Sequence, residues 1–255
     1  MAPPHRPPPR VLQVMAKQQI SPNMLRVRLG GPGMADFPAG AEGGYVKLML
    51  GGPQAGARPV VRTYTVRHQT AEAIDVDFAL HQDGTGEHGP ATDWALATQP
   101  GETIEVGGPG PAKPLPPGHT FYLIAGDMTA LPAIAVNLAA LPADARGAVV
   151  IEVNSAADQQ DLARPAGLSL AYHVNPHPGS NPQALVQGLA AQDPGGDEVY
   201  AWVACEFSAM RGLREYLRGQ RGLGPDRLYI SSYWKQGATE EAHKVVKRED
   251  AELAG

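Results

Sequence analysis

The hydrophobic pattern in the first part of the chain has the period of β-strands. Ile74, Val76 and Phe78 are apolar at every second position, with acidic residues between them. A period of two is typical of strands that place one face in a core. Glycine and proline clusters separate six segments expected as strands: Val11–Met15, Met24–Leu29, Tyr45–Leu50, Arg62–His68, Ile74–Leu80 and Thr103–Val106. Short strands at this spacing predict an antiparallel β-barrel over residues 11–107.

The pattern changes after a segment rich in proline and glycine, residues 108–118, which is expected to be a linker. Beyond it, continuous apolar runs predict the buried strands Phe121–Ala125, Ala148–Val153, Leu168–Val174, Val199–Ala204 and Leu228–Ser231. Helices are expected between and after them, at Leu131–Leu141 (opened by Asp127 or Thr129), Pro182–Ala190, Ala209–Arg218 and Thr239–Glu252. This alternation predicts a parallel-sheet α/β nucleotide-binding domain over residues 119–255.

Composition narrows the function classes. A net charge of −5 and a pI of about 5.9 argue against nucleic acid as a partner. No apolar run reaches the roughly 18 residues of a membrane span. The proline-rich residues 1–10 lack the apolar core of a secretory signal and are expected to be a disordered tail. A single cysteine, Cys205, excludes an internal disulfide, and the histidines show no metal-ligand spacing. We therefore expect a cytoplasmic monomer without a resident metal.

The segment Arg-Thr-Tyr-Thr at residues 62–65 carries the first candidate chemistry. An arginine and a hydroxyl on a strand can hold a phosphate, and a tyrosine offers a flat face to a planar ring. Taken alone, these residues favour an ordinary role, with Tyr64 in the core and Arg62 a surface charge. However, a second strand and then a helix start at Gly89–Trp94 follow, with Thr92 or Asp93 as the expected N-cap. Helix N-termini bind anions, so these elements could meet at one pyrophosphate.

These blocks resemble the siderophore-interacting proteins, which are flavin-dependent ferric-siderophore reductases within the ferredoxin-reductase-like group. The resemblance covers about residues 10–250 and rests on five blocks in order: 62–67, 75–81, 89–95, 126–133 (Gly-Asp-Met-Thr-Ala-Leu-Pro-Ala) and 232–237 (Ser-Tyr-Trp-Lys-Gln-Gly). It implies FAD as the cofactor, favoured over FMN because Gly89–Trp94 offers a second set of anion contacts. The implied cofactor-binding residues are Arg62, Thr63, Tyr64, Thr65, His81, Gly89, Ala91, Thr92, Trp94, Tyr233 and Trp234.

The electron donor is expected at the carboxyl ends of the second domain's strands. The candidate NAD(P)H-binding residues are Gly126, Asp127, Thr129, Ala130 and Glu206. The chain has no G-x-G-x-x-G fingerprint, and it has Met128 and Cys205 where the family commonly has an acidic residue and a glycine. These departures leave NADH, NADPH and reduced ferredoxin open as the donor. Glu206 itself could either cap the next helix or contact the nicotinamide, and Cys205 is expected to be a buried, inert thiol.

The terminal helix carries Lys244, Lys247 and Arg248, spaced to share one face. Such a face is usually solvated, with Glu240 paired to Lys244. The resemblance raises an alternative, because family members hold an anionic ferric siderophore with a small basic cluster. The expected siderophore-binding residues are Lys47, Lys244 and Arg248, with Lys235 and Lys247 in reserve.

The resemblance thus implies a flavoprotein that passes electrons from NAD(P)H, or from ferredoxin, through FAD to a ferric siderophore, and releases Fe(II). No catalytic acid or base is expected. Two alternatives stay open: a general NAD(P)H:flavin or ferredoxin-type reductase with another acceptor, and a non-catalytic siderophore-binding protein.

Overall fold

A computed structural model describes residues 8–51, 59–80, 88–196 and 198–254. The chain divides into two compact units, Met1–Lys113 and Pro114–Gly255. This division falls inside the segment 108–118, of which residues 108–110 belong to a strand. Most of the expected N-terminal tail lies outside the described residues, and Arg10 already begins the first strand.

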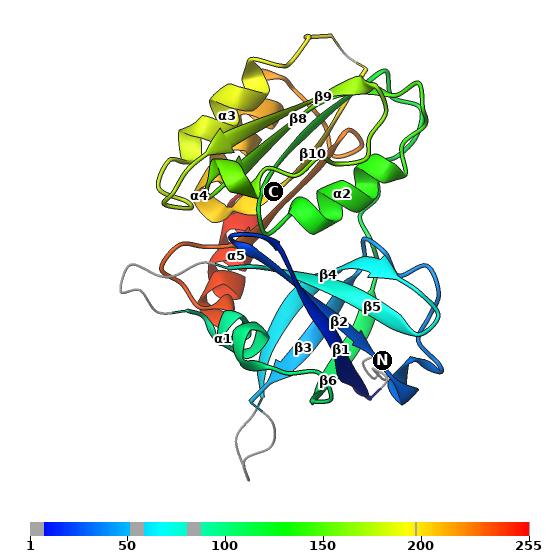
Figure 1. The fold of residues 1–255 in the computed structure, drawn as a ribbon. Helices are drawn as coiled ribbons and strands as arrows, with labels where there is room; N and C mark the ends of the chain where they lie inside the picture. The colour runs from blue at the N-terminus through cyan, green and yellow to red at the C-terminus, as the bar shows by residue number, and fades with distance from the viewer. Residues whose placement is uncertain (1–7, 52–58, 81–87, 197, 255) are drawn as a thin grey trace, which may run out of the picture. The chain divides into compact units, whose positions relative to one another are not determined.

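The first unit is a closed barrel of six antiparallel strands (Figure 1). Its strand order is β1-β2-β5-β4-β3-β6, and every neighbouring pair is antiparallel. The strands are β1 (Arg10–Ser21), β2 (Met24–Gly30), β3 (Tyr45–Leu50), β4 (Val60–Gln69), β5 (Ala73–Ala79) and β6 (Thr103–Gly110). A short 3-10 helix η1 (Pro32–Met34) follows β2, and the helix α1 (Pro90–Ala97) lies between β5 and β6 in the chain.

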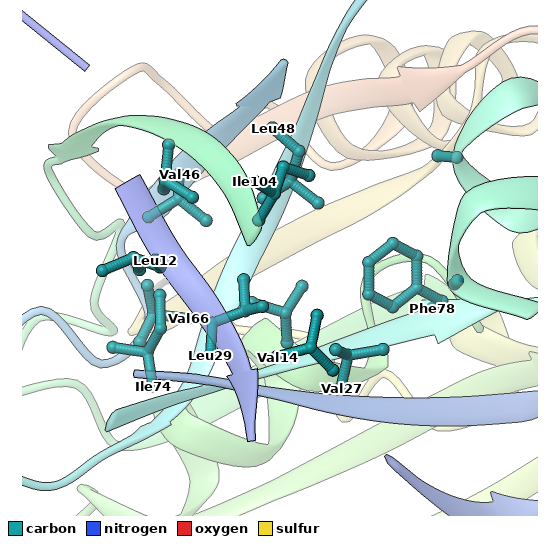
Figure 2. Close-up of a cluster of buried hydrophobic side chains, with 14 of the residues drawn as sticks. Leu12, Val14, Val27, Leu29, Val46, Leu48, Val66, Ile74, Phe78 and Ile104 are labelled. Atoms are coloured by element: carbon teal, nitrogen blue, oxygen red, sulfur yellow. The ribbon is translucent and has the colours of Figure 1, made fainter. Parts of the chain in front are cut away.

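Alternate side chains of all six strands fill the barrel, as the pattern predicted. Leu12, Val27, Leu48, Val66 and Phe78 are among the side chains that meet in its core (Figure 2). The alternation arises because successive strand residues point to opposite faces. Burial of these apolar side chains is the main force that closes the barrel.

Two expected strand ends were wrong because hydrogen bonding extends the strands past the apolar pattern. β1 continues from Met15 to Ser21 through polar residues that pair with β2. β6 continues from Val106 to Gly110 by pairing with β3. The expected N-cap of α1 was also wrong, because the helix begins at Pro90 with Gly89 as its N-cap.

The second unit is a five-stranded parallel sheet in the order β11-β10-β7-β8-β9. Its strands are β7 (Phe121–Asp127), β8 (Arg146–Val153), β9 (Gly167–Val174), β10 (Val199–Glu206) and β11 (Leu228–Trp234). The helices are α2 (Leu131–Ala139), α3 (Pro182–Ala190), α4 (Phe207–Arg214) and α5 (Glu240–Ala254). There is also a 3-10 turn η2 (Ala156–Asp158), and α4 continues as a π-helix η3 (Glu215–Gln220). The predicted fold class, a barrel followed by a parallel α/β domain, is confirmed.

Helices cover both faces of the parallel sheet (Figure 1). α3 and α4 pack on the face that carries Leu123 and Val203, and α2 packs on the opposite face through Ile134. Coverage on both faces explains why the strands are continuous apolar runs. Among the described helices, none has the length and apolarity to cross a membrane.

Candidate functional site

The Arg-Thr-Tyr-Thr segment lies on β4 beside the end of its ladder with β5. Residues 60–65 of β4 pair with β3, whereas the described ladder to β5 joins only Val66, His68 and Gln69. β5 continues along β2 as far as Ala79. The two strands therefore separate next to Tyr64, within the part of the barrel that the structure describes.

The strand period assigns the four residues of this segment to two faces. In the register with β3, Tyr64 lies opposite the buried Val46. Directly opposed residues share a face of the sheet, so Tyr64 and Arg62 belong to the core side. Thr63 and Thr65 belong to the other side. The structure thus groups Arg62 with Tyr64 and separates both from the two threonines.

Three aromatic rings from three elements follow one another at this place. The ring centroid of Tyr64 on β4 lies 4.4 Å from that of Phe78 on β5. The Phe78 centroid lies 5.7 Å from that of Trp94 on α1. Both spacings are typical of packed aromatic pairs. Tyr64 and Trp94, which are 30 positions apart in the chain, thus both pack against Phe78. The sequence did not reveal this arrangement.

The start of α1 supplies backbone donors. Ala91 and Thr92 are buried in its first turn, and no side chain among the described residues caps the N-terminus. Arg62 is partly buried and donates from Nη1 to the carbonyl oxygen of Val61 at 3.0 Å. A guanidinium, a helix N-terminus and a row of aromatic rings together fit the phosphates and the planar ring of a flavin nucleotide. The expected contact His81 lies outside the described residues.

In the second unit, carboxylates occupy the carboxyl edge of the sheet. Asp127, at the end of β7, is buried and accepts four hydrogen bonds. Thr129 donates to its Oδ1 from N at 2.9 Å and from Oγ1 at 2.5 Å. The backbone N of Glu206 and the indole Nε1 of Trp234 each donate to its Oδ2 at 2.8 Å. Burial raises the pKa of Asp127, and these hydrogen bonds oppose the rise.

Of the two roles expected for Glu206, the structure shows the helix cap, because its carboxylate caps α4. Oε2 accepts hydrogen bonds from the backbone N of Ser208 and of Ala209, and Oε1 accepts one from the backbone N of Gln236 at 3.2 Å. This cap starts α4 at Phe207, two residues before the expected Ala209. Backbone donors that could have bound a phosphate are therefore used by the chain's own carboxylate.

The start of α2 differs from the expectation in a similar way. Its N-cap is Ala130, not Asp127 or Thr129, and Pro132 lies in the first turn. Gly126 serves close packing inside the domain: a Cβ there would lie 2.8 Å from the carbonyl oxygen of Ala204 and 2.7 Å from Ile134 Cδ1. The glycine is thus required by β10 and α2, independently of any ligand.

Cys205 is fully buried, as expected. Burial raises the pKa of its thiol well above the usual value, and the nearby carboxylates add to the rise. A thiol in this state is a poor nucleophile. Glu152, at the end of β8 and paired with Asp127 on β7, is a further buried carboxylate that the sequence did not single out. It accepts a hydrogen bond from Asn175 Nδ2 at 3.1 Å, and burial raises its pKa.

Comparison with known proteins identifies the family. Residues 13–57 and 51–113 match the family model described as the siderophore-interacting FAD-binding domain. Residues 119–237 match the model described as siderophore-interacting protein. The chain belongs to the siderophore-interacting protein family. The resemblance inferred from the sequence blocks is therefore confirmed, including an FAD-binding domain family for the barrel unit.

Known proteins align with the chain over nearly its whole length. It is 31% identical to the ferric vibriobactin reductase ViuB of Vibrio cholerae, over 92% of each chain. It is 24% identical to the NADPH-dependent ferric-chelate reductase of Escherichia coli, covering 88% of this chain and 92% of that protein. The crystal structure of the siderophore-interacting protein SipS from Aeromonas hydrophila matches with a TM-score of 0.84 and 34% identity, covering 96% of this chain and 98% of that one.

The basic residues expected to bind siderophore lie on both units of this family member. Lys47 is partly buried on β3, on the face that it shares with Thr63. Lys244 and Arg248 are exposed on α5, and Lys244 Nζ pairs with Glu240 Oε1 at 2.7 Å. Lys235 follows β11, and its Nζ lies 5.1 Å from the ring centroid of Phe207.

Lys247 is exposed like Lys244 and Arg248, but its ammonium is bonded to β11. Its Nζ donates to Ser231 Oγ at 2.7 Å and to the carbonyl oxygen of Ser232 at 2.9 Å, and desolvation lowers its pKa. The ammonium thus fixes α5 on β11. Four residues earlier, His243 is buried, and its Nε2 lies 2.8 Å from Ser232 Oγ. No signal in the sequence showed that His243 lies on the side of α5 that packs against β11.

Metal binding gains no support from the described residues, because they contain no group of three or more His, Cys, Asp or Glu that could hold an ion.

Proposed function

We propose that this protein is a flavin-dependent ferric-siderophore reductase that works as a monomer in the cytoplasm. The observation that carries the proposal is the alignment with ferric vibriobactin reductase over 92% of both chains. The barrel supports it independently, because the residues around the end of the β4–β5 ladder have the chemistry that a flavin nucleotide needs. General flavin reductases share that chemistry, so the alignment and not the barrel favours a ferric siderophore as acceptor.

In this proposal the barrel holds FAD. Arg62 neutralises its diphosphate, and the N-terminus of α1, with Gly89, Ala91 and Thr92, donates backbone N–H groups to it. Tyr64 and Trp94, held around Phe78, pack against its planar rings. The remaining proposed contacts are Thr63, Thr65, His81, Tyr233 and Trp234. Bound FAD supplies the redox chemistry that links a two-electron donor to one-electron reduction of iron.

The basic side chains hold the substrate. Lys47, Lys244 and Arg248, with Lys235 and Lys247 in reserve, attract a ferric siderophore that carries negative charge. Reduction lowers the charge on iron, and hard oxygen donors then bind it less tightly. This account needs no side chain to move a proton at the metal.

For the electron donor we propose NADH or NADPH at the carboxyl edge of the sheet, near Gly126, Asp127, Thr129, Ala130 and Glu206. Reduced ferredoxin is the alternative donor. The carboxylates of Asp127 and Glu206 are already bonded within the domain, so they are proposed to shape this edge and not to contact phosphate.

The test is an anaerobic turnover assay. Protein loaded with FAD is mixed with NADH, NADPH or reduced ferredoxin, and then with a panel of ferric catecholate and hydroxamate chelates. We expect the donor to bleach the yellow colour, and a ferric chelate to restore it while Fe(II) accumulates in a colorimetric trap. Bleaching without any response to ferric chelates would indicate a general flavin reductase. A preparation that takes up no FAD would indicate a binding protein.

A further inference from the structure

The strand order of the parallel sheet indicates where a dinucleotide binds on the second unit. In the order β11-β10-β7-β8-β9, the chain runs outward from β7 through β8 and β9 on one side, and through β10 and β11 on the other. Sheets of this kind bind ligands at the point of reversal, outside the carboxyl ends of the strands. The adenosine half of a dinucleotide lies over the first strand-helix-strand unit, which here is β7-α2-β8.

The two helix starts beside this point differ in their caps. Oε2 of Glu206 accepts backbone hydrogen bonds at the start of α4. The start of α2 has no side-chain cap among the described residues. An uncapped helix start attracts phosphate through its backbone N–H groups. The pyrophosphate that NADH and NADPH share can therefore bind at α2 without a charged side chain.

The loops at this edge offer no lysine or arginine for a further phosphate. Residues 128–145, between β7 and β8, and residues 175–198, between β9 and β10, contain neither. Residues 154–166, between β8 and β9, contain only Arg164. Its Nε donates to the carbonyl oxygen of Leu168 at 3.2 Å, and Leu168 is the second residue of β9. Arg164 therefore lies at the amino edge of the sheet, away from the ends of β7 and β8.

Buried carboxylates lie where such a cation would be needed. Asp127 on β7 pairs in register with Glu152 on β8, and both residues are at most 5% exposed. Asn175 Nδ2 donates to Glu152 Oε2 at 3.1 Å, and the backbone N of Gly179 donates to Oε1 at 3.4 Å. These donors are neutral, so they hold the carboxylate in place without cancelling its charge. A 2′-phosphate on the adenosine ribose would bring nearly two further negative charges to this edge.

We propose that the second unit selects NADH over NADPH, and that Glu152 is the residue that rejects the 2′-phosphate. An acidic residue after the second strand suits the 2′-hydroxyl of NADH, whereas NADPH needs an arginine there. Rejection by a like charge is a common source of specificity. The use of the nucleotide as electron donor rests on the proposed function. The preference for the unphosphorylated ribose is a property of this unit alone.

The binding test uses two redox-inert fragments, ADP-ribose and 2′-phospho-ADP-ribose, titrated on the full-length protein by saturation-transfer NMR. The fragments differ only in the 2′-phosphate and lack the nicotinamide, so they report on this edge without turnover. We expect the wild type to bind ADP-ribose at least about tenfold more tightly than the phosphorylated fragment, because the phosphate meets a buried like charge.

Glu152→Gln keeps the shape of the side chain and removes its charge. We expect it to tighten binding of 2′-phospho-ADP-ribose about tenfold and to leave ADP-ribose within about twofold of the wild type. Asp161→Asn is the matched control, because it removes one negative charge from the same β8–β9 connection. The Asp161 side chain is 99% exposed and pairs with Arg164, so its charge is screened by water and salt, and neither affinity should change.

A second variant adds the missing cation. His177 is exposed in the loop that follows β9, two residues after Asn175. We expect His177→Arg to tighten binding of 2′-phospho-ADP-ribose about tenfold and to raise the rate at which NADPH bleaches bound FAD. Gln192→Arg is its control, because it adds a cation to the same β9–β10 connection after the end of α3.

Equal binding of the two fragments, tighter binding of the phosphorylated one, or no binding of either would overturn the inference. So would an unchanged preference in Glu152→Gln. If Glu152→Gln does not fold, His177→Arg decides alone: a gain for the phosphorylated fragment supports the proposal, and no gain contradicts it. If ADP-ribose is preferred but no ferric chelate is reduced, the proposed function fails, and the selection of the unphosphorylated nucleotide stands.

Discussion

The barrel and the parallel sheet each bury carboxylates, but they give them different partners. Asp75 and Asp77 on β5 and Asp127 and Glu152 at the sheet edge are all at most 5% exposed. In the barrel, Arg28 and Arg26 form two-pronged ion pairs with Asp75 and Asp77 across the β2–β5 ladder. At the sheet edge, neutral N–H and O–H groups surround the carboxylates.

The partners decide the direction of the pKa shift. Burial would raise the pKa of Asp75, but the hydrogen bonds and charge of Arg28, with the charge of Arg26, hold it below its usual value. Burial raises the pKa of Asp127 and of Glu152, and their neutral partners do not offset it. The barrel therefore uses carboxylates as fixed structural charges. At the sheet edge the buried carboxylates have no cationic hydrogen-bond partner among the described residues and their pKa is raised, a property that is common at ligand-binding sites.

The largest effect should come from breaking one barrel ion pair. Arg26→Ala leaves the buried Asp77 carboxylate without its guanidinium, and the free energy of unfolding should fall by about 3 kcal/mol. Arg28→Ala should cost about 1 kcal/mol, because the Arg28 side chain is 48% exposed against 22% for Arg26 and water replaces part of its contribution. Urea unfolding followed by circular dichroism gives both values.

A matched double variant sharpens this result. Arg26→Met combined with Asp77→Val removes both charges, and it should be more stable than Arg26→Ala alone, because no buried charge is left unpaired. Equal stability of Arg26→Ala and Arg28→Ala would contradict the ranking by burial.

The next effect is a contrast in pH dependence. The lowered pKa of Asp75 means that its contribution is present above its unfolded value of 3.8 and is lost as pH falls through the lower folded value. The free energy of unfolding of Asp75→Asn should therefore be lower than that of the wild type at pH 7 and equal to it in strong acid. The raised pKa of Glu152 has the opposite sign: its contribution is present below 4.5 and is lost as pH rises.

Glu152→Gln should therefore gain stability relative to the wild type as pH rises from 4.5 toward 7, by about 1 kcal/mol or less, since a neutral amide avoids the buried charge. Denaturant titrations at a series of pH values measure both differences. If the stability difference from the wild type changed with pH in the same direction for Asp75→Asn and Glu152→Gln, the two regions would not differ in the way proposed.

The pattern of apolar residues predicted the barrel and the parallel sheet correctly, because each period follows directly from backbone geometry. Strand ends were less predictable. β1 runs six residues beyond Met15 because its hydrogen bonds to β2 do not depend on side-chain polarity. Helix starts depend on which side chain reaches a free N–H, and at α4 this is Glu206, whose capping role was one of the two that the sequence left open.

The candidate site was predicted as far as local motifs extend. The motif placed Arg62 and Tyr64 together on β4, but only the fold shows that Phe78 joins Tyr64 to Trp94. Contacts between residues far apart in the chain, such as Asp127 with Trp234, left no trace in the sequence, because each residue alone also has an ordinary role.

The smallest predicted effect concerns the buried imidazole of His243 on α5. Burial lowers the pKa of His243, and so does the charge of Lys247 and Lys235, whereas Glu240 and Glu206 act the other way. A lowered pKa means that the contribution of His243 is present above 6.5 and is lost as pH falls. Acidification from pH 7.5 to 5.5 should therefore weaken the docking of α5 on β11.

Hydrogen exchange can measure this loosening. We expect amide protection in α5 to fall a few-fold more than the intrinsic pH effect, and His243→Gln to remove that extra loss. Lys244→Gln is the control, because it breaks a surface ion pair with Glu240 and leaves the contact with Ser232 intact. If acidification lowered amide protection in α5 as much in His243→Gln as in the wild type, another titrating group would be responsible.

The most direct test of the account is the affinity of the barrel for FAD, measured by calorimetric titration of the wild type, Arg62→Gln and Arg67→Gln. Both arginines are partly buried on β4, but Arg67 lies among the charges of Arg26, Asp77 and Glu42. We predict that Arg62→Gln weakens FAD binding about 10- to 100-fold, the value of a charge-assisted contact to phosphate, and that Arg67→Gln stays within about twofold of the wild type. Unchanged binding by Arg62→Gln, or an equal loss in Arg67→Gln, would contradict the assignment of the flavin site to Arg62 and Tyr64.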